Sequence, residues 1–119
     1  MTVLVAVSDS REGRSALTAA VEEAQTLGTE LVVVNLALGK VDTSAVPDGL
    51  TYEVVERQGH ADADPVDTVL AALEARPAVT RLVLGMRRRS PIGKAVLGSV
   101  TQRLLLESPV PVLAVKVAT

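Results

Sequence analysis

Two nearly unbroken apolar runs stand out in the first third of the chain, Val3 to Val7 and, apart from Asn35, Leu31 to Leu38. Such runs are typical of parallel strands that helices cover on both faces. Between them, apolar residues recur at the three- and four-residue spacing of a helix face, namely Ala16, Leu17, Ala20, Val21, Ala24 and Leu27. The pattern predicts a strand, a helix and a parallel strand, joined by a right-handed crossover.

The ends of this first helix carry residues that favour helix caps. Ser10 or Asp9 can accept the first free N–H groups, and Gly28 follows the last apolar position. Helix capping is therefore an alternative to a binding-site role for Ser8 and Asp9.

The rest of the chain continues the alternation of strand and helix. Strands are predicted at Tyr52 to Arg57, Arg81 to Leu84 and Val112 to Val117. Helices are predicted to begin at Asp64-Pro65 and at Gly98-Ser99. We expect a single α/β domain over residues 1–119, with an open, mostly parallel five-stranded sheet and helices on both faces.

The connection from Gly39 to Thr51 has no helical periodicity. Parallel strands need a crossover of about a dozen residues or more, which this segment just provides. An antiparallel third strand remains the alternative.

The amino-acid composition and the net charge disfavour several classes of function and partner. Hydrophobic residues make up 48% of the 119 residues, but Phe and Trp are absent and Tyr52 is the only aromatic, so the core is expected to be aliphatic. A net charge of −2 gives no case for nucleic acid or an acidic membrane surface as partner. The chain has no cysteine, which suits the reducing cytoplasm. The first apolar run is too short for a signal sequence or a membrane span.

The segment from Leu84 to Thr101 is the best candidate for a ligand site, because it reads as a strand, a basic loop with glycines, and a helix start. A helix N-terminus offers unpaired N–H groups, and glycine lets an anion approach the backbone, so phosphate is the natural ligand. Ser99 and Thr101 add hydroxyl groups. The cationic side chains of the loop are Arg87, Arg88, Arg89 and Lys94, and a solvated charged loop is the alternative interpretation of that run.

Several other chemistries lack the residues that they need. Arg88 and Ala95 stand where a Walker P-loop requires glycine and a Ser or Thr, and the turn from Ser8 to Gly13 lacks the dinucleotide-binding glycines. His60 has no second His or Cys nearby to form a metal site. No Ser, His and acid can be placed at one strand end, so nucleophilic catalysis has no support.

The spacing of the loop resembles that of the universal stress protein family. The family's pattern of glycines and Gly-Ser falls on Gly85, Arg88, Gly98 and Ser99, and is followed by Ser108 to Leu113. The opening segment Val5-Ala6-Val7-Ser8-Asp9-Ser10 also fits, so the resemblance covers almost the whole chain.

This resemblance implies a strand order 3-2-1-4-5 and ATP held by the glycine loop, whereas the chain is expected to lack the family's second helix. The order places a topological switch point between the first and fourth strands, where open α/β sheets bind ligands. Carried over residue by residue, the resemblance assigns phosphate and ribose contacts to Gly85, Arg87, Gly98, Ser99, Val100 and Thr101. Leu36 matches a backbone contact to adenine.

Two positions depart from the family's pattern. Arg88 replaces the middle glycine, so its side chain either crowds the phosphate or contacts it. The acid expected directly after the first strand aligns with Ser8, with Asp9 one place later, and both remain candidates for a contact to ribose or Mg²⁺. A tight turn and a helix N-cap are the alternative interpretation of Gly85, Gly98 and Ser99.

The sequence thus indicates a cytoplasmic, homodimeric stress-response module that binds ATP or a related adenine nucleotide, with at most slow hydrolysis. A dimeric scaffold that binds no nucleotide is the alternative. An FMN-binding flavodoxin-like protein is disfavoured because the loops offer no aromatic side chain for the flavin. The dimer is expected to form through the apolar last strand, by Val112, Leu113, Ala114, Val115 and Val117.

Overall fold

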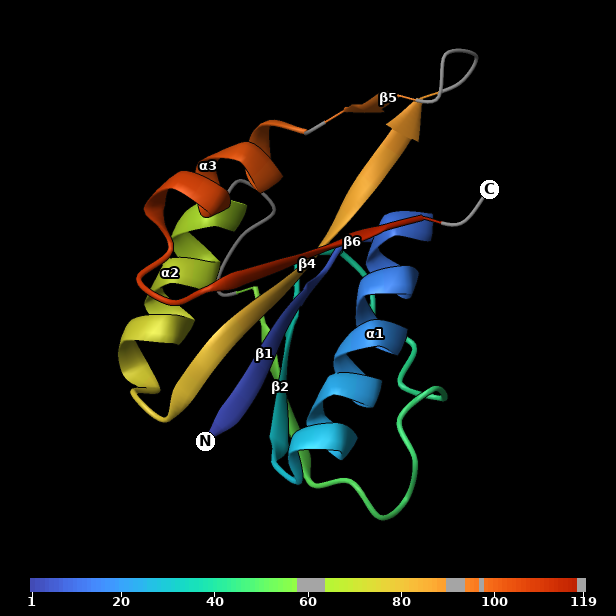
Figure 1. The fold of residues 1–119 in the computed structure, drawn as a ribbon, viewed down its shortest axis with the longest axis vertical. Coiled ribbons are helices and arrows are strands. Elements are labelled where there is room, and N and C mark those ends of the chain that lie inside the picture. Colours follow the sequence, from blue (N-terminus) through green and yellow to red (C-terminus); the bar gives the residue numbers. More distant parts are fainter. Residues whose placement is uncertain (58–63, 90–93, 97, 118–119) are drawn as a thin grey trace.

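The computed structural model describes residues 1–57, 64–89, 94–96 and 98–117. At its centre is a sheet whose parallel strands lie in the order β3-β2-β1-β4-β6 (Figure 1). These strands are β1 (Thr2–Val7), β2 (Glu30–Asn35), β3 (Tyr52–Glu56), β4 (Val79–Arg89) and β6 (Val112–Lys116). The predicted α/β class with parallel order 3-2-1-4-5 is confirmed. Because β3 is parallel to β2, the antiparallel alternative is wrong.

Strand β1 lies in the middle of the sheet, and all six of its residues are buried. Val3 and Val5 face α1 (Arg11–Leu27), whereas Leu4 and Ala6 belong to the core under α2 (Pro65–Ala75) and α3 (Ser99–Glu107). Figure 1 shows α1 on one side of the sheet and α2 and α3 on the other. The core is built of Val, Leu and Ala, as predicted. None of the described helices is long and apolar enough to cross a membrane.

The helix ends follow the capping chemistry of the sequence. Ser10, not Asp9, caps α1, because its Oγ accepts the N–H of Gly13 at 3.2 Å. Gly28 ends that helix in the left-handed region, with φ at 65°. Asp64 caps α2 by accepting the N–H of Val66 at 2.8 Å.

The segment between β2 and β3 forms no helix, as predicted, and passes alongside α1 (Figure 1). Val46 from this segment is buried in the core between α1 and the sheet, and Val41 and Leu50 pack against the same core. A few apolar side chains therefore cover the part of the sheet that a helix would otherwise cover.

Two strand ends differ from the prediction by three residues or more. Strand β2 ends at Asn35 rather than Leu38, because the Asn35 Oδ1 accepts the N–H of Ala37 at 2.9 Å and turns the chain. Strand β4 continues to Arg89, where a loop was expected. It finds partners beyond Leu84, first in β6 up to Met86 and then in the short antiparallel strand β5 (Lys94–Val96).

We predict that Gly13→Ala destabilises the fold although alanine is the better helix former by about 1 kcal/mol. A Cβ at Gly13 would overlap the backbone carbonyl of Ser8, which no change of rotamer can relieve. The expected net loss is about 1–3 kcal/mol in free energy of unfolding, measured by denaturant titration. Gly39→Ala is the control, since nothing described lies within 4 Å of that position. Equal stability of the two variants would contradict the close packing of α1.

Candidate functional site

A pocket of about 210 Å³ lies at the carboxyl ends of the parallel strands. Its walls come from the ends of β1, β2 and β3, from the middle of β4 and from the first turns of α2 and α3, with Ala6, Ser8, Leu36, Arg57, Pro65, Leu84, Gly85, Val100 and Thr101 as lining residues. From β1 the chain crosses to β2 over one face, and from β4 to β6 over the other. The pocket is therefore at the topological switch point, where open α/β sheets bind their ligands.

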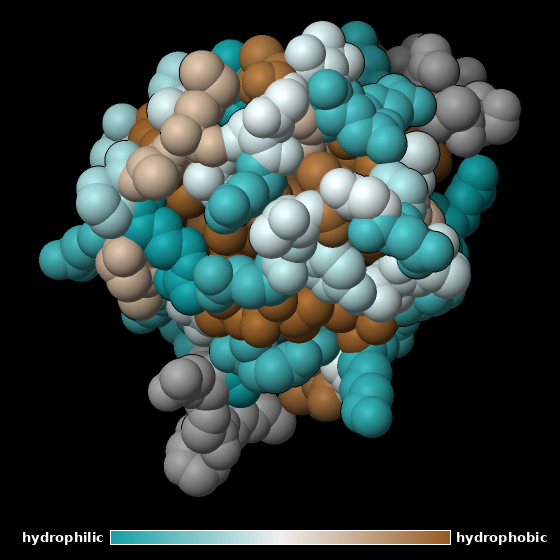
Figure 2. Space-filling view, turned by 90° about the horizontal axis from the view of Figure 1, so that it is seen from below, coloured by the Kyte–Doolittle hydropathy of each residue, from teal (hydrophilic) through white to brown (hydrophobic). Residues whose placement is uncertain are grey.

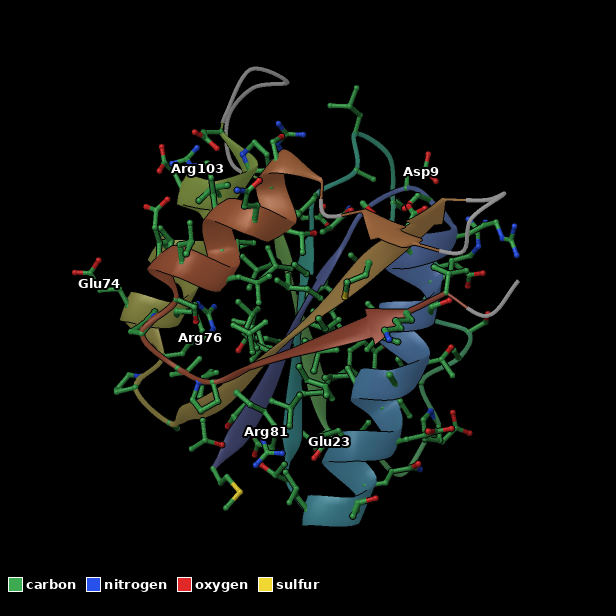
Figure 3. The ribbon with its side chains drawn as sticks, turned by 45° about the horizontal axis from the view of Figure 1, so that its top comes forward. Asp9, Glu23, Glu74, Arg76, Arg81 and Arg103 are labelled. Atoms are coloured by element: carbon green, nitrogen blue, oxygen red, sulfur yellow. The ribbon has the colours of Figure 1, made fainter. Side chains whose placement is uncertain are left out.

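Five of the predicted site residues line this one pocket: Ser8, Leu36, Gly85, Val100 and Thr101. They lie far apart in the sequence and are brought together by the parallel strand order. Asp9, Gly98 and Ser99 are exposed and do not line it. Figure 3 shows Asp9 near the start of α1.

The first turn of α1 fixes the position of Ser8. The Ser8 and Ser10 hydroxyl groups lie 2.6 Å apart, and the Ser10 N–H donates to the Ser8 carbonyl at 2.9 Å. Ser8 is thus tied to the residue that caps the helix, while its side chain stays exposed at the edge of the pocket.

Gly85 lies within β4, so its interpretation as a tight turn is wrong. A Cβ there would overlap the backbone carbonyl of Glu12, because the first turn of α1 lies directly against this strand. The Gly85 carbonyl accepts the Thr101 hydroxyl at 3.3 Å. Gly85 therefore contacts α1 on one side, and its carbonyl is hydrogen-bonded to α3 on the other.

Among the described residues, no side chain caps the N–H groups at the start of α3. Its N-cap is Gly98, not Ser99, and Gln102 makes the first intrahelical bond by donating to the Gly98 carbonyl at 2.9 Å. A helix start of this kind presents free N–H groups and the positive end of the helix dipole. Val100 and Thr101, in the first turn of α3, line the pocket, so the start of the helix lies at the pocket wall.

Sequence reasoning missed Arg57 as a site residue. Its NH1 group donates to the Leu36 carbonyl at 2.9 Å, and both residues line the pocket. It was assigned only to the end of a strand. The indication was available, because the residue after a parallel strand reaches the same sheet edge as the residues after the neighbouring strands.

The ends of β2 and β3 are held by Asn35, which is fully buried. Its Nδ2 donates to the Gly39 carbonyl at 2.7 Å and to Glu56 Oε2 at 3.0 Å. The next residues of the two strands are Leu36 and Arg57. A satisfied buried amide therefore fixes the backbone on which these two pocket residues stand.

The remaining predicted residues lie away from the pocket or outside the part of the chain that the structure describes. Arg87 and Arg88 belong to β4 by their backbone, but their side chains lie outside what the structure describes, as does all of His60. Leu113 in β6 is 40% exposed, and Val117, directly after that strand, is buried. Among the described residues, no group of His, Cys, Asp or Glu is arranged to hold a metal ion.

A larger open hollow, of about 860 Å³, lies at the opposite end of the sheet, between the end of α1 and the segment from Pro47 to Thr51. Figure 2 views this end and shows apolar residues between hydrophilic ones. None of the predicted nucleotide-site residues lines it. It lies at the amino ends of the strands, so its size does not make it the better candidate.

Arg103 links the two helices whose first turns reach the pocket. Its NH1 lies 3.2 Å from Asp64 Oδ2 at the start of α2, and its Nε lies 3.2 Å from Glu107 (Figure 3). The backbone N–H of Val66 and then the Arg103 guanidinium lower the pKa of Asp64 below its usual value.

The fold and the pocket at its switch point define a doubly wound α/β protein. The family model described as Universal stress protein family matches residues 1–116. A universal stress protein of Mycolicibacterium smegmatis is 36% identical over an alignment 129 positions long, and this alignment covers 96% of each chain. The chain belongs to the universal stress protein family.

Solved structures of the family share this fold. A universal stress protein from Archaeoglobus fulgidus matches with a TM-score of 0.75 and 26% identity, covering 98% of each chain. Another from that organism, in complex with dAMP, has a TM-score of 0.70 and 21% identity, again over 98% of each chain. A universal stress protein in complex with cAMP has a TM-score of 0.65 and 18% identity, over 99% of this chain and 98% of that one.

We predict that the stabilising effect of the Asp64 carboxylate depends on pH. The folded-state pKa is lowered, so the contribution is present above the unfolded pKa of about 3.9 and is lost as pH falls through the folded pKa. Asp64→Asn keeps a capping oxygen but no charge. Its melting temperature should lie below that of the wild type at about pH 7, and the gap should close toward about pH 2. In an Arg103→Met background the gap at neutral pH should shrink, and a gap independent of pH would contradict the assignment.

Proposed function

We propose that this universal stress protein is a cytoplasmic, homodimeric module that binds ATP or a related adenine nucleotide at the switch-point pocket. The observation that carries the proposal is the single pocket that joins Ser8, Leu36 and Gly85 to Val100 and Thr101 at the start of α3. Family structures in complex with dAMP and cAMP support it.

The size of the pocket suggests how the ligand would lie. Small-molecule pockets usually enclose about 300–1,000 Å³, so a pocket of about 210 Å³ would enclose only part of a nucleotide. We place the base and ribose between Leu36 and Ser8, with the phosphates extending toward Gly98 and Ser99. The free N–H groups of α3 would then face the phosphates, and Arg87 and Arg88 remain the proposed cationic partners.

Mg²⁺ would enter this site with the triphosphate. Mg²⁺ in nucleotide sites is held mainly by phosphates and water, with one or two carboxylates. Asp9 is the exposed carboxylate next to Ser8 at the carboxyl end of β1. The protein's own contribution would be binding and orientation, because the described pocket walls contain no acid or histidine to activate water.

One observation favours the scaffold alternative. Contact with the first turn of α1 is sufficient to require glycine at Gly85, so that motif glycine does not need a ligand to explain it. A dimeric interaction module without nucleotide therefore remains the second candidate function.

We predict that Gly98→Val abolishes ATP binding while lowering the free energy of unfolding by only about 1 kcal/mol, the cost of a poorer N-cap. Gly98 has φ at −67°, which valine can adopt, and nothing described lies within 4 Å of its missing Cβ. Side-chain bulk would therefore block the ligand rather than the fold. Calorimetric titration with ATP and Mg²⁺ measures the effect, and Gly49→Val, in the loop before β3, is the control with equal open space.

The wild type should bind ATP and Gly49→Val should match it. If neither binds, the nucleotide proposal fails and the scaffold alternative stands. If Gly98→Val binds as well as the wild type, the placement of the phosphates is wrong.

We predict that Leu113→Asp weakens a homodimer formed through β6. Among the described strands β6 pairs only with β4, and Leu113 is its exposed apolar side chain. Two buried carboxylates in place of two leucines should weaken the dimer at least about tenfold. Light scattering at micromolar concentration measures the mass. Leu106→Asp, at an 80% exposed position on α3, is the control, and a monomeric wild type would refute the dimer.

A further inference from the structure

We propose that the outer edge of β3 binds an extended segment of a partner protein, which carries a basic side chain and adds to the sheet as a further strand. The proposal goes beyond nucleotide binding and does not depend on it. Among the described strands, β3 is the last one at the edge opposite β6, so a dimer through β6 would not cover it.

The backbone of β3 has hydrogen-bonding groups that point away from the sheet. Leu31 is paired with Tyr52 in the parallel register, and its N–H donates to the Thr51 carbonyl at 3.1 Å. In such a ladder the residues on either side of Tyr52 bond to β2, whereas the N–H and C=O of Tyr52 itself face outward. Val54 and Glu56 have the same phase. No described strand pairs with these groups, so an added strand would use them.

A groove of about 420 Å³ lies beside this edge, between β3 and α2. Val55 and Ala72, which belong to the core under α2, form its apolar part. The helix lines it with the small side chains of Thr68 and Ala71. Its volume lies within the range of about 300–1,000 Å³ that is usual for ligand pockets. Alternate side chains of a strand point to the same face, so every second side chain of an added strand would enter the groove.

The charges around the groove favour a basic segment. Arg76 lines the groove but is already paired with Glu53 at 2.6 Å. Asp67 also lines it, as an exposed carboxylate that pairs with no described cation. Strand β3 itself carries Glu53 and Glu56 and no basic residue. Because like charges on opposite residues destabilise a strand pair, this edge disfavours β3 of a second copy and favours a segment with Lys or Arg.

The directions of β3 and α2 define the pattern of the segment. Glu53, near the start of the strand, pairs with Arg76, which ends the helix. Asp67 is in the first turn of α2, so it lies at the other end of the groove from that ion pair. An apolar side chain of the segment would lie against Val55 and Ala71. A basic side chain two residues along the segment would then reach Asp67.

The test uses fluorescently labelled peptides with blocked termini. The peptide TVTKTVT provides apolar and basic side chains at this spacing, and TVTETVT replaces the lysine by glutamate. Fluorescence anisotropy at low ionic strength should show that the wild type binds the lysine peptide at least about tenfold more tightly than the glutamate peptide. Asp67→Asn should reduce that ratio.

Peptides with N-methyl groups test the backbone contact on the unaltered protein. Successive N–H groups of a strand point to opposite edges, so only one alternate set of residues in the peptide would donate to β3. N-methylation of that set should abolish binding of TVTKTVT, and N-methylation of the other set should leave it intact. Loss of binding with both sets, or with neither, would contradict strand addition.

Ala71→Leu tests the groove. This helix position is exposed and leucine is a good helix former, so the fold should be kept while the side chain fills the groove. We expect the affinity for TVTKTVT to fall at least about tenfold. Ala75→Leu is the matched control, because Ala75 is exposed on the same helix and does not line the groove. It should bind the peptide as the wild type does.

Several outcomes would overturn the proposal. They are equal binding by Ala71→Leu and the wild type, equal binding of the lysine and glutamate peptides, and no binding of either peptide. Light scattering that shows the wild type assembling into open-ended chains, with Ala71→Leu preventing this assembly, would assign the edge to a second copy of the chain. That result would overturn the proposal as well.

Discussion

The structure depends on how closely the first turn of α1 lies against the sheet. Two glycines make this approach possible: Gly13 of the helix meets the backbone of Ser8, and Gly85 of β4 meets the backbone of Glu12. Two backbones in contact leave no space for a side chain. This contact fixes the end of β1 relative to β4, and the pocket opens between those two strands.

The other half of the pocket depends on polar anchoring instead of close backbone packing. Asn35 is fully buried and uses both ends of its amide, on Ala37, Gly39 and Glu56. A buried amide that lost these partners would cost about 1–3 kcal/mol per unmade bond, so the turn after β2 has one strongly favoured shape. That turn fixes the positions of Leu36 and Arg57. The two walls are thus held by different kinds of interaction.

Most of the fold could be predicted from the sequence because its patterns are local. The run Val3 to Val7 predicts a strand covered on both faces, and the caps at Asp64 and Gly28 mark helix ends by their own chemistry. The extension of β4 to Arg89 could not be predicted in this way. It depends on the partners that β6 and β5 provide, and no pattern within the strand itself specifies them.

The residues of the candidate site also fall into those that the sequence predicted and one that it did not. The resemblance and the switch-point rule brought Ser8, Leu36, Gly85, Val100 and Thr101 to one pocket, because strand order alone decides which chain segments meet there. Arg57 was missed because its role comes from reaching sideways to Leu36, a tertiary contact that alternation along a strand does not encode.

The two motif glycines carry different weight as indicators of a ligand. Gly85 is required by α1, so its presence follows from packing. Gly98 has a backbone conformation that any residue can adopt, and no described atom lies near its missing side chain. Neither strain nor internal packing among the described residues therefore explains glycine at the start of α3. Glycine suits the N-cap position that it holds there, and it also leaves the N–H groups of the helix unobstructed, which is the property that an anionic ligand would use.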